Sequence, residues 1–400
     1  MNHDRYPAAK HQPDRPRISR ALALVMALPL MTGCSQSAAT FERQSATSSP
    51  RPTAAASPEA TPSTEPTADV SSDDPEPNST AHTRCEPTLA EDTFQKGLQV
   101  YWHTNDERLE SQAHDVMEYA KELHANSVGI TFPFDVDGAA PTTVRAGAET
   151  PAPEHLRVVI AAAQERGLRT MLRPLMDEQT ILDDDPTKWR GSITVKSPDQ
   201  WFERYQTFLQ PYLELAQDMC VDEFILGSEL NSLQKYPQQW QELKDHAQKT
   251  YGGELSYSFN WNAASSKLSL DSLGIDMYPP VKRTDNASVN DIADDLSTWL
   301  RTQKATIGGD ITVDEAGIPA QPGLYSTPWR WGNDRVPVTD VGEQTQAKWF
   351  AAAALAAERE SAGIYYWMVD SNLDTANPPS SPGSFIGRPA EQAIKDAYRE

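Results

Sequence analysis

FILGSELNSL, residues 224–233, is the stretch of sequence that decides the fold. It joins an apolar run, typical of a buried strand, to a polar turn that carries Glu229. Similar apolar runs alternate with longer amphipathic segments along the chain. The eight expected strands cover residues 97–101, 127–132, 169–173, 223–227, 255–259, 273–277, 311–315 and 363–367. Eight strand-then-helix units over roughly 300 residues predict an α/β fold, the (β/α)₈ or TIM barrel.

The expected helices fill the spaces between these strands. They cover residues 109–124, 153–166, 199–218, 237–250, 287–304, 342–361 and 389–398. Only a short connection, residues 265–271, separates the fifth and sixth strands. An open doubly wound sheet is the alternative fold. When it binds nucleotides it carries a glycine-rich first turn, and the sequence contains neither GxGxxG nor a P-loop.

The net charge of −22 limits the partners of the protein. Nucleic acids and anionic lipid surfaces are bound through clustered Lys and Arg, so we expect neither as a partner of the folded domain. Residues 1–33 contain five basic and two acidic residues, and residues 35–84 contain three basic and seven acidic ones. Most of the negative charge therefore belongs to residues 85–400, which favours a neutral partner over an acidic one.

Residues 1–33 are typical of a secretory signal peptide. A basic region precedes the apolar run 21–31, which is too short to span a bilayer as a stable helix. MTGC, residues 31–34, resembles the lipobox of bacterial lipoproteins, in which the cysteine is acylated and becomes the mature N-terminus. This resemblance implies an extracytoplasmic protein that is anchored to the cell membrane through lipid on Cys34. The alternative is a plain signal peptide with an incidental cysteine.

Residues 34–84 are expected to form a lipid-anchored, disordered linker. About two-thirds of residues 35–84 are Ser, Thr, Pro or Ala, and large apolar residues are almost absent. Such a segment cannot bury enough surface to offset its chain entropy. The catalytic domain then covers residues 85–400, and we expect it to be a monomer.

Two further cysteines lie in the expected domain. Cys85 precedes the first expected strand and Cys220 precedes the fourth, so both belong at the N-terminal end of the barrel. A secreted setting permits a disulfide bond between them, and two unpaired thiols are the alternative. CxxC, HExxH and EF-hand spacings do not occur, so we expect no metal and no cofactor.

Two glutamates follow buried-strand patterns at the end of the barrel where chemistry takes place. Glu229 follows the fourth expected strand, and Glu315 ends the seventh, in ITVDEAGIPA. Cleavage of a glycosidic bond needs one protonated carboxyl group and one ionised carboxylate. Asp314 is adjacent to Glu315, and strand alternation predicts that their side chains point to opposite sides.

The order of several motifs resembles the clan A glycoside hydrolases. Tyr278 follows the sixth expected strand in GIDMYPP, and Trp367 ends the eighth in GIYYWMVD. VGITFPFD at the second strand, LRPLMDE followed by KWRGSI at the third, and GSELNSL at the fourth are similar to glycoside hydrolase family 113, the β-mannanase family. The resemblance spans residues 95–398.

This resemblance implies a role for each matching residue. Glu229 would be the general acid/base, Glu315 the nucleophile, Tyr278 a hydrogen-bond donor to the nucleophile and Trp367 the floor of the sugar subsite. Most of clan A has an asparagine before the acid/base, where it contacts the sugar 2-hydroxyl. Here that position is Ser228. Family 113 also differs from the clan at this position, and the axial 2-hydroxyl of mannose could accept a different contact.

Further substrate-binding candidates follow the expected strands. Flat side chains on which sugar rings could stack are Trp102, Trp189, Trp261, Trp329 and Trp331, and the alternative for each is packing inside the protein. Polar candidates are His103, Asp135, Arg173, Asp177, Asn231, Asn260 and Asp276. His103 could bind substrate or be structural. Arg173 could position the acid/base or pair with Asp177.

The two glutamates and the acidic composition, together with what the resemblance to family 113 implies, predict a retaining glycoside hydrolase acting on a β-1,4-linked neutral polysaccharide or oligosaccharide, with β-mannan as the substrate that the resemblance implies. One alternative keeps the fold and changes the substrate to another β-glycan, such as a glucan or a xylan. A second alternative is a surface lipoprotein that binds glycans without cleaving them.

Overall fold

Eight parallel strands form a closed barrel in the computed structural model, which describes residues 85–103, 107–330 and 337–399. Neighbouring strands follow the order β1–β9–β8–β7–β6–β5–β4–β2, and the pairing of β1 with β2 closes the ring. The barrel strands are β1 (Gln95–Tyr101), β2 (Ser127–Val136), β4 (Arg169–Met176), β5 (Glu223–Ser228), β6 (Glu254–Phe259), β7 (Ser272–Met277), β8 (Thr312–Ala316) and β9 (Gly363–Asp370). The predicted (β/α)₈ fold is confirmed.

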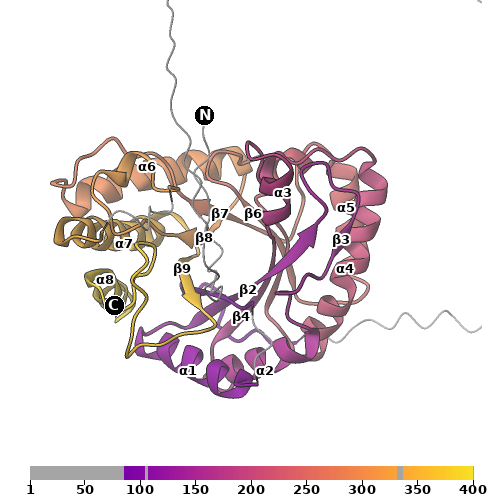
Figure 1. Cartoon of the computed structure of the whole chain (residues 1–400), viewed down its shortest axis with the longest axis horizontal. Helices are drawn as coiled ribbons and strands as arrows, with labels where there is room; N and C mark the ends of the chain where they lie inside the picture. The colour runs from indigo at the N-terminus through magenta and orange to yellow at the C-terminus, as the bar shows by residue number, and fades with distance from the viewer. Residues whose placement is uncertain (1–84, 104–106, 331–336, 400) are drawn as a thin grey trace, which may run out of the picture. The chain divides into compact units, whose positions relative to one another are not determined.

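Helices surround the strands, as Figure 1 shows. They are α1 (Leu109–Glu122), α2 (Pro153–Gln164), α4 (Pro198–Asp218), α5 (Pro237–Ala247), α6 (Val289–Ile307), α7 (Asp340–Glu360) and α8 (Pro389–Arg399). Each matches an expected helix to within a few residues, and no helix forms between β6 and β7. No described helix has the length and apolar character needed to cross a membrane.

The ends of the helices follow local sequence signals. Proline occupies the first turn of α2, α4 and α5, where its missing N–H removes no hydrogen bond. The hydroxyl of Ser288 accepts from the backbone N–H of Asp291 and starts α6, which ends at Gly308 in the left-handed conformation with φ +89°. Thr339 caps α7, so this helix begins two residues before the expected position.

Five short elements of the described chain were not expected, and all of them follow a barrel strand, at the C-terminal end of the barrel. β2 continues to Val136 and pairs there in antiparallel fashion with β3 (Val144–Arg145). α3 (Gln179–Asp184) follows β4, and the 3₁₀ turns η1 (Arg190–Ser192), η2 (Asn231–Leu233) and η3 (Leu324–Ser326) lie in loops after strands. Elements of two to six residues are too short for hydrophobic periodicity to reveal.

The interior of the barrel contains polar side chains as well as apolar ones. Gln99 bridges strands, because its amide donates to the backbone oxygen of Asp314 at 2.7 Å and accepts from Thr131 at 2.8 Å. Glycine provides the room: a Cβ at Gly129 would lie 2.3 Å from the Gln99 amide oxygen, and one at Gly274 would lie 1.7 Å from an Asp314 carboxylate oxygen. Small residues on β2 and β7 therefore make space for a polar layer.

A disulfide bond joins Cys85 to Cys220, with a Cα–Cα distance of 5.5 Å. It holds the start of the described chain at the N-terminal end of β5. Thr88 adds two hydrogen bonds there, from its N–H and its hydroxyl to the Asp222 carboxylate at 2.7 and 3.0 Å. A cavity of about 1100 Å³ borders this segment, at the end of the barrel away from Glu229 and Glu315.

The expected signal peptide (1–33), Cys34 and the expected linker (34–84) lie outside the described residues, as does Trp331.

Candidate active site

Glu229 follows the last residue of β5 and is 1 % exposed. Its backbone lies in the left-handed region with φ +56°, a conformation that non-glycine residues rarely adopt. The Glu229 N–H donates to the Ser258 carbonyl at 2.9 Å, and its own carbonyl accepts from the Asn231 N–H at 2.8 Å. These backbone bonds hold the turn that directs the carboxyl group into the site.

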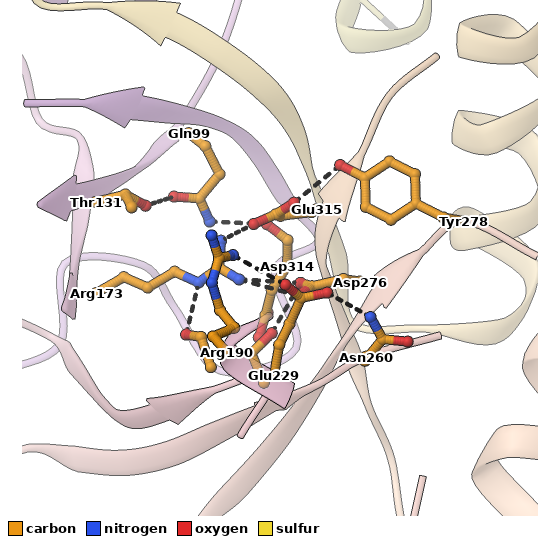
Figure 2. Close-up of polar contacts among 12 residues, drawn as sticks. Gln99, Thr131, Arg173, Arg190, Glu229, Asn260, Asp276, Tyr278, Asp314 and Glu315 are labelled. Atoms are coloured by element: carbon orange, nitrogen blue, oxygen red, sulfur yellow. Dashed lines mark hydrogen bonds and ion pairs between the residues drawn. The ribbon is translucent and has the colours of Figure 1, made fainter. Parts of the chain in front are cut away.

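Each oxygen of the Glu229 carboxyl group accepts one hydrogen bond. The Asn260 amide donates to Oε1 at 2.6 Å and the Arg190 guanidinium donates to Oε2 at 3.0 Å (Figure 2). The Asn262 N–H donates to the amide oxygen of Asn260 at 3.3 Å, which sets the orientation of that amide. Glu229 is thus held from two sides.

Burial raises the pKa of Glu229 to about 7, against its ordinary value near 4.5. The positive charge of Arg190 opposes this rise, and the negative charge of Glu315 adds to it. A carboxyl group with this pKa can exchange a proton near neutral pH, which is the property that a general acid/base requires.

Glu315 lies in β8 and is fully buried. Arg173 from β4 forms an ion pair with Oε1, and the Tyr278 hydroxyl donates to Oε2 at 2.8 Å. An arginine and a phenol both donate to the ionised form of a carboxylate. Glu315 and Glu229 therefore have contrasting surroundings at the same end of the barrel.

A β-bulge in β8 determines where Asp314 points. Ile275 pairs with Val313 and Asp276 pairs with Glu315, so one extra residue is present in β8. Strand alternation predicts opposite sides for Asp314 and Glu315, and that expectation is wrong because the bulge interrupts the alternation. Asp314 lies inside the barrel over Gly274 and is 1 % exposed. Burial, together with the charge of Glu223, raises its pKa well above the usual range.

Arg173 connects the polar groups of the site. Its Nη2 donates to both oxygens of Asp276 at 3.1 and 3.2 Å, and its Nε donates to the Ser228 hydroxyl at 3.0 Å. Its guanidinium carbon also lies 5.9 Å from the centre of the Trp367 ring. The structure thus pairs Arg173 with Glu315 and Asp276 and shows no ion pair with Asp177. The Asp177 carboxylate accepts from the Gln179 N–H at 2.8 Å.

Ser228 orients the arginine through the hydrogen bond that its hydroxyl accepts. The hydroxyl is buried between strands, and Ser258 performs a similar task by donating to Asp276 at 2.9 Å. Two serines at the ends of β5 and β6 therefore help to fix the Arg173–Asp276 pair, which in turn holds Glu315.

Arg190 is the residue of the site that the sequence reasoning missed. It lies in KWRGSI, one of the stretches that resemble the family, directly after Trp189. Its side chain is 4 % exposed and contacts Glu229 on one side and Glu178 on the other. A basic residue in a short loop gives no sequence pattern that distinguishes it from a surface charge.

Several aromatic candidates meet beside these carboxylates. Trp367 and Tyr278 form a small apolar cluster with Leu175, and Tyr101, Trp261 and Trp329 pack against it. Trp261 and Trp329 stack on each other with ring centres 4.8 Å apart and planes 17° apart. Both are partly exposed and come from different loops. They provide flat apolar surface at the C-terminal end of the barrel.

Other candidates lie elsewhere or have structural partners. Trp102 is fully buried in the main hydrophobic core and has no exposed ring face for a sugar. Trp189 lies over Gly191, in the loop that contacts Glu229. His103 forms an ion pair with Asp370 at 3.1 Å. Burial alone lowers the pKa of His103, but the hydrogen bond and charge of Asp370 outweigh it, and the net pKa is raised.

Two candidates lie at the rim of the site. Asn231 is the first residue of η2, directly after the Glu229 turn, and is half-buried. Asp135 is half-buried near the end of β2, and a Cβ at Gly147 would lie 2.3 Å from its carboxylate. Among the described residues, no group of three or more His, Cys, Asp and Glu side chains could hold a metal ion.

A family model described as Glycoside Hydrolase Family 113 matches residues 100–385. No curated protein sequence matches the chain.

Solved structures share the fold. A GH113 β-1,4-mannanase superposes with a TM-score of 0.65 at 20 % identity, covering 77 % of this chain and 99 % of its own. The GH113 β-mannanase from Alicyclobacillus acidocaldarius, in complex with ManMIm, gives 0.63 at 21 % identity and 76 % and 97 % coverage. A GH5_18 protein from Streptomyces cattleya gives 0.53 at 13 % identity and 77 % and 80 % coverage. At these identities the likenesses show the shared fold.

Proposed function

The chain belongs to glycoside hydrolase family 113, within the clan A glycoside hydrolases, and from this membership we propose that it is a retaining hydrolase of β-1,4-linked mannan. The observation that carries the proposal is the contrast between two buried carboxyl groups at one end of the barrel. Glu229 has its pKa raised to about 7, whereas Glu315 accepts from a guanidinium and a phenol. The similar solved structures are those of GH113 β-mannanases, which supports mannan as the substrate.

In the first step of the proposed reaction, protonated Glu229 donates its proton to the leaving glycosidic oxygen. The Glu315 carboxylate attacks the anomeric carbon, and the bond to the leaving sugar breaks as the bond to Glu315 forms. Arg173 and Tyr278 hold Glu315 in place for this attack. Burial raises the pKa of Glu229 and keeps the proton available near neutral pH.

In the second step, water replaces the sugar on Glu315. Glu229, now ionised, removes a proton from the water, whose oxygen attacks the anomeric carbon while Glu315 leaves as a carboxylate. The negative charge of Glu315 is absent while the sugar is attached to it. Since that charge raises the pKa of Glu229, its absence favours the ionised base.

The sugar-binding surface of the proposal consists of Trp367, Tyr278 and the stacked pair Trp261 and Trp329. Sugar rings stack on flat apolar faces of this kind. Asn260 adjoins both Glu229 and Trp261 and so belongs to the side on which the leaving group would lie.

The test is a screen of the purified protein on mannan, glucan and xylan, with reducing ends as the readout. We expect release from mannan, and loss of nearly all turnover in Glu229→Gln and Glu315→Gln. Glu203→Gln, an exposed glutamate on α4, is the matched control and should keep full activity. Proton NMR of the first product should show the β-anomer. An α-anomer would contradict a retaining mechanism. Release of reducing ends from glucan or xylan alone would show that mannan is not the substrate.

We also propose that Cys34 carries a lipid and that the protein is anchored outside the cytoplasm. The support is the MTGC sequence after a basic and apolar leader. Mass spectrometry of the mature protein from a bacterial host should find acylated Cys34 as the first residue. An unmodified N-terminus at another residue would contradict the anchor.

A further inference from the structure

Arg190 forms a bridge between two buried carboxyl groups. Its Nη1 donates to Glu229 Oε2 at 3.0 Å, and its Nε lies 3.2 Å from Glu178 Oε1. Nε also donates to the Met176 carbonyl at 3.0 Å, and the Arg190 N–H donates to Glu178 at 3.1 Å. All three charged side chains are less than a tenth exposed. A guanidinium with this many fixed partners has little freedom to move.

The loop that carries Arg190 is itself held in place. The Ser192 hydroxyl accepts from the Trp189 N–H at 3.0 Å, and the Ser192 N–H donates to the Trp189 carbonyl at 2.9 Å. Gly191 lies against Glu229, because a Cβ there would be 2.9 Å from the Glu229 carbonyl oxygen. The loop after α3 thus contacts both the main chain and the side chain of Glu229.

A carboxyl oxygen has two lone-pair directions. Asn260 occupies one direction on Oε1, and Arg190 occupies one on Oε2. Two donors on different oxygens fix the plane of the carboxyl group and leave the remaining directions for a proton. A proton donor must be aimed within hydrogen-bond reach of the leaving oxygen, so this plane matters for catalysis.

We propose that Arg190 is a positioning residue for the acid/base: the Glu178–Arg190–Glu229 bridge fixes the plane of the Glu229 carboxyl group for proton transfer to the leaving group. The inference rests on the proposed function and adds a residue to it. An arginine suits this role because its planar guanidinium presents donors in a rigid fork, whereas a lysine ammonium is a point charge.

The charge of Arg190 has a separate effect, on the pKa of Glu229. It lowers the pKa of Glu229 and so favours the base form. The other charged groups that face Glu229 are Arg173, Glu315 and Glu178. The charge of Glu229 also acts on Asp276, whose pKa it raises. Removal of Arg190 should therefore move the alkaline limb of the pH profile of kcat/KM upward, because the proton would leave Glu229 at higher pH.

The experiment compares two substrates in Arg190→Met and Arg190→Lys. One is an unactivated manno-oligosaccharide, whose leaving group needs a proton. The other is a dinitrophenyl β-mannoside, whose leaving group departs without one. In Arg190→Met we expect kcat/KM to fall about tenfold to a hundredfold on the oligosaccharide and less than about threefold on the activated substrate. Arg190→Lys should recover only part of the loss.

Two further variants make the result specific. Glu178→Gln weakens the ion pair between Glu178 and Arg190 and leaves Glu229 itself unchanged. It should also lower kcat/KM more on the oligosaccharide than on the activated substrate, but by a smaller factor than Arg190→Met. Arg157→Met breaks an exposed ion pair with Asp218 on α4 and should leave both substrates unaffected. Thermal melts show whether each variant is folded.

Equal losses on both substrates, or no loss on either, would overturn the positioning role. Failure of the proposed function looks different, because the wild-type protein would then release no reducing ends from mannan. If the wild type cleaves another β-glycan instead, the same pair of leaving groups on that sugar tests Arg190.

Discussion

Glu229 carries opposite requirements in the two halves of the proposed reaction, and its surroundings are balanced between them. Burial and the charge of Glu315 favour the protonated acid, whereas Arg190 favours the ionised base. Glu315 has a simpler environment, in which Arg173 and Tyr278 both donate to the carboxylate. The residues placed around these two glutamates thus suit them to the different roles that we propose.

The first prediction concerns the pH dependence of activity. The proposed first step needs protonated Glu229, so kcat/KM on a manno-oligosaccharide should fall as pH rises through about 7, the value to which the Glu229 pKa is raised. The fall should approach tenfold per pH unit above that point. Initial rates between pH 5 and 9 at low substrate concentration measure it. An activity that stays constant to pH 9 would rule out Glu229 as the acid.

Asp314 is predicted to be dispensable for turnover despite lying next to Glu315. Its carboxyl group is buried, and burial raises its pKa well above the usual range, so the folded state binds this proton more tightly than the unfolded state does. Binding of this proton by Asp314 therefore contributes fully to the free energy of unfolding below about pH 3.8, and the contribution declines as pH rises above that value. An asparagine at position 314 does not ionise, so the free energy of unfolding of that variant should not decline in this way as pH rises.

Asp314→Asn should therefore melt at a higher temperature than the wild type at pH 8, with the difference shrinking toward pH 4. Its kcat should stay within about fivefold of the wild type, in contrast to Glu315→Gln, because a group that does not react costs little when replaced by an isostere. Asp310→Asn, which alters an exposed carboxylate at the start of the same strand, is the control. A loss of turnover equal to that of Glu315→Gln would instead place Asp314 in the reaction.

At the scale of elements, the strands were the most predictable part of the molecule. Each of the eight barrel strands has an apolar run, because both faces of a parallel barrel strand are covered. The helices could also be predicted, from their caps and prolines. Glu229 and Glu315 could be identified as candidates because the position after a barrel strand has a fixed meaning in this architecture.

The contacts within the site were less predictable, for identifiable reasons. The bulge in β8 needs a register shift relative to β7, which no local pattern reveals. The partners of Arg173 lie on β5, β7 and β8, so they depend on how the barrel closes. Arg190 lies in a loop whose conformation depends on Gly191 and Ser192 meeting Glu229 and Trp189 in space.

The loop around η1 leads to a prediction at this scale. Gly191→Ala places a Cβ 2.9 Å from the Glu229 carbonyl oxygen and 2.4 Å from the Trp189 ring. The ring can shift, but the carbonyl is held by the Asn231 N–H, so the loop must move away from Glu229. We expect kcat/KM to fall about tenfold, because the displaced loop carries Arg190 away from Glu229.

Gly309→Ala is the matched control, because a Cβ there meets nothing within 4 Å. Activity should be unchanged in this variant. Wild-type activity in Gly191→Ala would contradict the view that contact between this loop and Glu229 is needed for turnover.

In the folded domain as a whole, the candidate active site and the disulfide bond lie at opposite ends of the barrel. Glu229 and Glu315 occupy the C-terminal ends of β5 and β8, whereas Cys220 precedes the N-terminal end of β5. The strands between them are packed into one continuous core with the helices. A change at the disulfide should therefore act on the stability of the domain without altering the geometry of the site.

The last prediction follows from that separation. The bond between Cys85 and Cys220 closes a loop with a sequence separation of 135 residues, and closing so long a loop removes much of the entropy of the unfolded chain. Replacing both cysteines by serine should lower the free energy of unfolding by about 2–5 kcal/mol. The kcat at 25 °C should stay at the wild-type value, because the hydrogen bonds around Glu229 and Glu315 do not involve this end of the barrel.

Urea unfolding of the wild type and the double variant measures the change. Thr88→Val is a useful control, since it removes only the hydrogen bond from the Thr88 hydroxyl to Asp222 at the same place and should cost about 1 kcal/mol or less. If the double variant loses no more stability than Thr88→Val, chain entropy is not what the disulfide contributes. If the double variant is folded but has a lower kcat, the two ends of the barrel are coupled. The core between them would then not isolate the active site from changes at the disulfide bond.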